Sequence, residues 1–114
     1  MEKEKIIQFL KEARQLITPA GAWCQNASAL DAQGALAGPT LPNACAWCAT
    51  GAVERVGRQA GPFLLGLCFA ALADTIQTEI GVDLRQFIAL YNDTHTHSEI
   101  LAWFDQTIIR LEAP

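Results

Sequence analysis

The residues that most constrain the fold lie near the end of the chain, where a helix start signal directly precedes a helical apolar pattern. Thr96-His97-Ser98-Glu99 has the capping-box pattern, in which a hydroxyl and a carboxylate each accept a backbone N–H at a helix N-terminus. Apolar residues then recur at spacings of four, four and three: Ile100, Phe104, Ile108 and Leu111. This spacing places them on one face of a helix, which we predict over residues 97–112.

Similar start and stop signals mark the ends of other predicted helices. Apolar residues at helical spacing predict a first helix from about Glu2 to Ile17, which ends because the residue before Pro19 disfavours helical geometry. Asn43 has N-cap chemistry, so we expect a second helix from there to about Arg58. Asp83 has the same chemistry before a short helix later in the chain.

The segment that begins at Pro62 is predicted to be a helix that runs to about Ile80. Proline suits the first helical turn, where its missing N–H is not needed. The first half of this segment is apolar nearly all round, so we expect it to be the central and most buried helix.

Residues 19–43 are rich in glycine and proline and show no helical period. The tetrapeptide Asp31-Ala32-Gln33-Gly34 has turn chemistry, with aspartate first and glycine fourth. We therefore predict a small β-hairpin in which residues 22–30 pair with residues 35–41.

Composition agrees with a folded, mainly helical chain. Hydrophobic residues make up 51% and charged residues 18% of the 114 residues, which excludes intrinsic disorder. This length is typical of one domain. We expect a mostly α fold: a compact single domain over residues 1–114, with about five short helices and a small β-hairpin in the insertion at about 19–43.

The charge balance restricts the partners. The formal net charge is −4, which disfavours proteins that hold nucleic acid through phosphate contacts or bind anionic membrane surfaces. The longest weakly polar run, residues 60–73, is shorter than the ~20 residues of a membrane helix. The charged start of the chain does not resemble a targeting signal, so a cytoplasmic location is expected.

Four cysteines invite a test of thiol and metal chemistry. On a helix, Cys45 and Cys48 would share an apolar face with Ala52 and Val56, and we favour a packing role because buried free cysteine behaves as a small hydrophobe. The C-x-x-C spacing keeps a thiol-redox function open. A zinc site that adds a second pair of ligands, His95 and His97, is the other alternative; no cofactor is favoured.

Other polar and small residues have structural interpretations. Asn92 and Asp93 are expected to be turn residues that bond nearby backbone N–H groups, and His97 to lie at the surface or donate to that turn. Gly51, one turn after Trp47, predicts a close approach between helices. The chain lacks the nucleophile, phosphate-loop and dinucleotide motifs of common enzymes, which makes an enzyme the least favoured class.

Two motifs carry a family resemblance. Residues 47–52 read W-C-x-x-G-A, and residues 91–101 read aromatic-N-D followed by T-H-x-E-I-L. Together they resemble a family of small uncharacterised bacterial and phage proteins known only as a domain of unknown function. The resemblance implies an N-terminal helix, a variable segment with a hairpin and helices that carry the motifs, and it transfers no catalytic residue.

These observations favour a small acidic module that binds another protein without catalysis. Candidate interaction residues are Trp47, Asn92, Asp93 and His97. The expected partner is a protein with a basic surface, since opposite charges steer encounters, and a homodimer is left open. A narrower hypothesis is a phage- or mobile-element-encoded inhibitor of a host defence complex (anti-CRISPR-like), which draws on the phage members of the resembling family.

Overall fold

The computed structural model describes residues 2–76 and 83–114. Within these residues the chain forms five α-helices: α1 (Glu2–Leu16), α2 (Ala49–Val56), α3 (Pro62–Thr75), α4 (Leu84–Thr94) and α5 (His97–Glu112). A short 3-10 helix, η1 (Ala20–Ala22), and a two-stranded antiparallel sheet, β1 (Ala29–Leu30) with β2 (Ala46–Trp47), lie between α1 and α2. The predicted mostly α fold with a small antiparallel sheet is confirmed. None of the described helices is long and apolar enough to cross a membrane.

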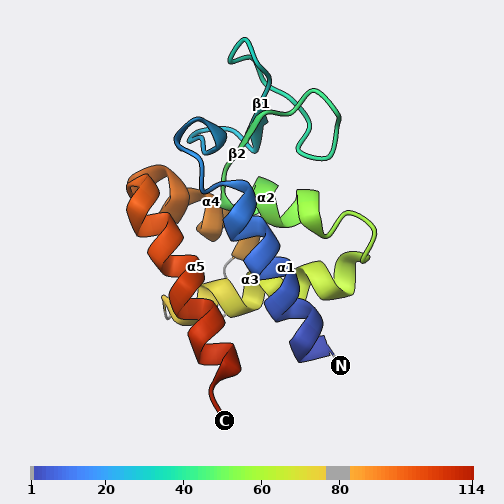
Figure 1. Cartoon of the computed structure of the whole chain (residues 1–114), viewed down its shortest axis with the longest axis vertical. Helices are drawn as coiled ribbons and strands as arrows, with labels where there is room; N and C mark the ends of the chain where they lie inside the picture. The colour runs from blue at the N-terminus through green and yellow to red at the C-terminus, as the bar shows by residue number, and fades with distance from the viewer. Residues whose placement is uncertain (1, 77–82) are drawn as a thin grey trace.

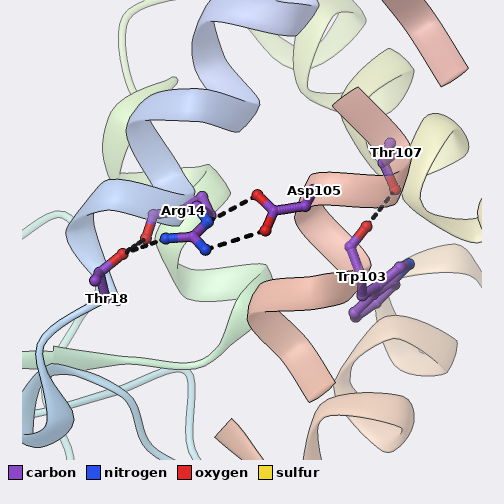
Figure 2. Close-up of polar contacts among 5 residues, drawn as sticks. All are labelled: Arg14, Thr18, Trp103, Asp105 and Thr107. Carbon is purple, nitrogen blue, oxygen red and sulfur yellow. Dashed lines mark hydrogen bonds and ion pairs between the residues drawn. The ribbon is translucent and has the colours of Figure 1, made fainter. Parts of the chain in front are cut away.

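Helices α1 and α5 pack together along one side of the molecule (Figure 1). Leu10 of α1 and Phe104 of α5 are fully buried in the common core. Outside this core, the Arg14 guanidinium donates two hydrogen bonds of 2.9 and 3.1 Å to the Asp105 carboxylate, as Figure 2 shows. Arg14 also donates to Thr18 Oγ1 at 3.0 Å, so one side chain joins α5 to the end of α1.

The predicted capping box of α5 is confirmed. The Glu99 N–H donates to Thr96 Oγ1 at 3.2 Å, and the Thr96 N–H donates to Glu99 Oε1 at 2.8 Å. Hydrogen bonding of the Glu99 carboxylate, first to the Thr96 N–H and then to the Thr96 side chain, holds the pKa of the Glu99 carboxyl below its ordinary value. The helix spans the predicted residues because its start is specified by side chains three positions apart.

The predicted start of the second helix at Asn43 is wrong, since α2 begins at Ala49 and Cys48 is its N-cap. Residues before it are extended because their backbone groups pair with a distant segment. The Cys45 N–H donates to Leu30 O at 2.8 Å, and the Cys48 N–H donates to Ser28 O at 3.1 Å. Cys45 and Cys48 therefore do not share a helix face.

The hairpin prediction is correct for the turn and for a short pairing beyond it, but the regular sheet pairs other residues. The Asp31 carboxylate accepts the N–H groups of Gln33 and Ala35 at 2.9 Å, which closes the expected turn. Beyond the turn an antiparallel bridge joins Leu30 to Leu36, and the Ala37 N–H donates to Ala29 O at 3.1 Å. The sheet instead pairs β1 with β2.

Residues 31–45, which connect β1 to β2, project beyond the helices as two loops (Figure 1). Trp47 Nε1 donates to Pro39 O at 2.9 Å, and the Arg55 guanidinium donates to the same oxygen and to Leu41 O. These bonds fasten the loop that contains Pro39 and Leu41 to β2 and α2. Leu36, in the loop before it, is 79% exposed.

Helix α3 is less buried than predicted. Its inner side contributes Phe69 and Leu72 to the core, and Leu72 O accepts a hydrogen bond from Trp103 of α5. Pro62, Phe63 and Gly66 in its first half are exposed, so the expectation that it is the most buried helix is wrong, although it is central in the sense that it contacts each of the other four helices. The most buried turn is instead the start of α2. The predicted end of the third helix, near Ile80, lies outside the described residues.

Gly51 allows another segment to approach closely, as predicted, but that segment is the extended backbone at Ser28 and not a helix. A Cβ built on Gly51 would lie 1.9 Å from Ser28 O, the same carbonyl that accepts the Cys48 N–H. The backbone of the segment before β1 therefore lies directly on the first turn of α2, where no side chain fits.

We expect Gly51→Ala to destabilise the fold by about 3 kcal/mol or more, because the methyl group must push the Ser28 backbone away. Gly66→Ala is the matched control: Gly66 is also inside a helix, but no atom lies within 4 Å of its built Cβ. That variant should gain about 0.5–1 kcal/mol from helix propensity. Urea denaturation measures both. Equal effects of the two substitutions would contradict a steric role for Gly51.

Candidate functional site

Asn92 joins three segments of the chain. It lies in the last turn of α4, not in the turn predicted from the sequence, and its side chain is 0% exposed. Asn92 Oδ1 accepts Trp23 Nε1–H at 2.8 Å and the Ala49 N–H at 3.0 Å. Asn92 Nδ2 donates to Cys24 O at 3.0 Å and to Asp93 Oδ1 at 3.1 Å. One amide thus holds the end of α4, the start of α2 and the segment after α1 together.

A neighbouring glutamine completes this junction by capping α4. Gln25 Nε2 lies within hydrogen-bond distance of three carbonyl oxygens at the end of the helix, those of Asn92, Asp93 and His95. The Asn26 N–H donates to Asp93 Oδ1 at 2.8 Å. Sequence reasoning did not identify Gln25, because a polar residue in a glycine- and proline-rich stretch carries no sign of a partner about 70 positions away.

The two histidines serve different neighbours. His97 stacks on Trp23, with ring centroids 5.1 Å apart and planes 6° from parallel, and its Nε2 lies 2.6 Å from Ile17 O. His95 stacks on Tyr91, and its Nδ1 lies 2.7 Å from Tyr91 O. The structure does not bring the two imidazoles together with Cys45 and Cys48. The described residues contain no cluster of three or more histidine, cysteine or acidic side chains suited to a metal ion.

The cysteines differ in exposure. Cys45 is exposed, whereas Cys24, Cys48 and Cys68 are buried. Burial raises the pKa of Cys24 and of Cys68 to about 11 and also raises that of Cys48, where the Gly51 N–H bonded to the sulfur opposes the rise. At neutral pH these three are thiols, which are weak nucleophiles compared with thiolates.

Two of the predicted interaction residues are therefore inside the protein. Asn92 is fully buried, and Trp47 is 6% exposed with its N–H donated to a backbone carbonyl. Asp93 and His97 are half-buried, and each makes internal hydrogen bonds. The polar groups singled out by the sequence motifs are largely used to hold the fold together.

Exposed apolar side chains lie on a different surface, formed by α3 and α4. A groove of about 300 Å³ lies between α3 and α4, and a second of about 400 Å³ lies along α4. Asp83 lines both grooves, and Leu90, which is 60% exposed, lines the second. Phe63 is 69% exposed and follows Pro62, which lines the first. We call the two grooves with Phe63 and Leu90 the α3–α4 face. Neither residue belongs to a motif, and neither falls on the apolar stripe of its helix.

Comparison with known proteins identifies one family. The family of unknown function DUF6197 matches residues 1–110. No curated protein matches the chain, and no solved structure matches it.

We expect Asn92→Ala to destabilise the protein by about 3 kcal/mol or more, because it leaves buried N–H and C=O groups without partners. Asn92→Asp should be about as harmful despite its equal size, since it places an oxygen against Cys24 O and Asp93 Oδ1. The exposed Asn43→Ala serves as control and should change stability by less than about 0.5 kcal/mol. Denaturation curves decide the question, and a stable Asn92→Asp variant would show that the Nδ2 bonds are dispensable.

The cysteine environments predict the number of reactive thiols. Native protein treated with a disulfide reagent at pH 8 should show one fast-reacting thiol, and Cys45→Ser should abolish it, because the other three are buried with raised pKa values. All four should react in urea. Two fast thiols, or thiols protected until a chelator is added, would instead favour the redox or zinc alternatives.

Proposed function

We propose that this chain, which belongs to the DUF6197 family, is a non-catalytic module that binds another protein through the α3–α4 face. The observation that carries the proposal is the exposure of large apolar side chains on two adjoining helices: 69% for Phe63 and 60% for Leu90. Exposed apolar surface next to grooves is typical of protein interaction sites. A core role does not explain these residues, because the described residues 2–76 and 83–114 leave them largely exposed.

The chemistry of the polar groups supports a non-catalytic role. Buried Cys24, Cys48 and Cys68 are protonated at neutral pH, and both imidazoles are stacked on aromatic rings. Trp47, Asn92 and His97 of the motifs make hydrogen bonds to groups of the protein itself. These features favour binding over nucleophilic or acid–base catalysis.

Charge supports a basic protein partner. Asp83 lines both grooves, the charge of Arg85 in the first groove is balanced by Glu54, and the chain carries a net charge of −4. The arginines that would have to form a phosphate-binding patch have internal acceptors: Arg55 on Pro39 O and Leu41 O, Arg58 on Arg55 O, Arg85 on Glu54, and Arg110 on Asp74 O. We therefore favour an apolar protein segment flanked by lysine or arginine over nucleic acid. Inhibition of a host defence complex is a narrower version that the partner's identity would decide.

The test begins with proximity labelling in cells that encode the protein, followed by reconstitution of the enriched partner. Leu90→Glu and Phe63→Glu should each weaken the purified complex by about tenfold or more, because a buried charge replaces an apolar contact. Leu36→Glu is the matched control, since Leu36 is 79% exposed but lies in a projecting loop away from the helices. The association rate should fall as salt is raised.

Three outcomes would overturn the proposal. Equal loss of affinity in the Leu36 variant would place the interface elsewhere. A concentration-dependent dimer that Leu90→Glu dissociates would show that a second copy covers the face. Tight, salt-tolerant nucleic-acid binding would contradict the assigned partner class.

A further inference from the structure

Gly66 lies within α3 and lines the groove of about 300 Å³ between α3 and α4. It is exposed, and among residues 2–76 and 83–114 no atom lies within 4 Å of a Cβ built on it. Leu65, Phe69 and Leu84 supply apolar walls of the same groove. The missing side chain therefore leaves open space beside three apolar ones.

The internal packing of the protein does not require a glycine at this position. Glycine within a helix is less favourable than alanine, because it loses more conformational freedom on folding. At Gly51 and Gly57 the fold explains the glycine, since a built Cβ would lie 1.9 Å from Ser28 O and 2.6 Å from Leu65 Cδ2 respectively. Gly66 meets no such neighbour in the described part of the chain. The space over it is therefore available to a molecule that comes from outside.

The charges around this space favour a positive group. Arg85 pairs with Glu54, and its guanidinium lies 5.1 Å from the centroid of the Phe69 ring, so its charge is used inside the protein. Asp83 is exposed and forms no ion pair within the described residues; its Oδ1 accepts the backbone N–H groups of Arg85 and Gln86. A cation at the groove meets a carboxylate that no side chain neutralises, whereas an anion is repelled by it.

We propose that the groove over Gly66 receives one large apolar side chain of the partner, aromatic or branched, and that a lysine or arginine next to it lies close to Asp83. The proposal rests on the function proposed above for the α3–α4 face, and it adds the kind of partner residue that this face recognises. Gly66 is the residue that sets the specificity, because any side chain at position 66 would occupy the space that the partner residue needs.

Small probes test the groove without the partner. The full chain is titrated by NMR with 2-phenylethylammonium, which joins an aromatic ring to a positive charge. Phenylacetate, 2-phenylethanol and n-butylammonium serve as the anionic, neutral and ring-free probes. The first probe should shift the amide signals of Gly66 and Leu84 with an affinity in the millimolar range. Phenylethanol should bind about two- to threefold more weakly, and phenylacetate more weakly still.

Two results of this titration would overturn the proposal. Equal affinities of phenylacetate and 2-phenylethylammonium would show that Asp83 does not select a cation. An n-butylammonium affinity equal to that of 2-phenylethylammonium would show that the groove does not hold an apolar ring.

Variants separate binding from folding. Gly66→Leu fills the groove but replaces glycine by a better helix former. The affinity for 2-phenylethylammonium should therefore fall about tenfold or more, while the denaturation midpoint stays equal or rises. Ala70→Leu is the matched control, since Ala70 is exposed one turn later in α3 and is not among the residues that line the groove. Retained affinity in Gly66→Leu, or equal loss in Ala70→Leu, would refute the assignment.

Asp83→Asn tests the charge alone, because asparagine is as good an N-cap as aspartate. This variant should bind 2-phenylethylammonium and 2-phenylethanol equally. A preference for the ammonium that survives the substitution would contradict the role of Asp83.

The reconstituted complex distinguishes this assignment from the proposed function. Gly66→Leu should weaken the complex about tenfold or more, as in the probe experiment. A complex that tolerates Gly66→Leu but is weakened by Phe63→Glu and Leu90→Glu would overturn the role of the groove and leave the α3–α4 face as the interface. If the two charged variants also have no effect, the proposed function fails as well.

Discussion

The fold depends on one buried amide. The β1–β2 sheet has only two residues in each strand and cannot by itself hold the long irregular segment between α1 and α2. Asn92 supplies the missing connection, because its side chain uses both donor and acceptor atoms on groups from different segments. Since each of those groups is removed from water, the junction must be complete to be stable. The junction fixes where α2 begins relative to the end of α4 and to the segment after α1.

Local signals predicted the fold well where partners are close in sequence. Thr96 and Glu99 lie within one turn, and Asp83 caps the N–H groups of the next residues, so α4 and α5 begin where expected. The extended conformation of Cys45 was missed because its backbone partner, Leu30, is 15 positions away and leaves no local mark. For α3 the error has another cause: composition shows that a helix is apolar, but not whether enough chain exists to cover every side of it.

The candidate sites show the same contrast between what a local pattern predicts and what only the folded chain determines. The motif residues Trp47 and Asn92 were recognised as special, and they are, but their role is to join segments. The surface proposed for binding contains residues that no motif includes, such as Leu90. A leucine can serve as an interaction residue only when the rest of the protein leaves it exposed. That exposure is a property of the folded chain and not of a local pattern.

The capping of α4 by Gln25 implies an order of assembly. The capping box of α5 can close as soon as that helix forms, since its two side chains are neighbours. The end of α4 is completed only when a side chain 70 positions earlier arrives, which requires closure of a long loop and its entropic cost. Helix α5 is therefore suited to early folding, whereas the end of α4 and residues 23–26 are expected to gain protection from solvent exchange together, as one cooperative unit.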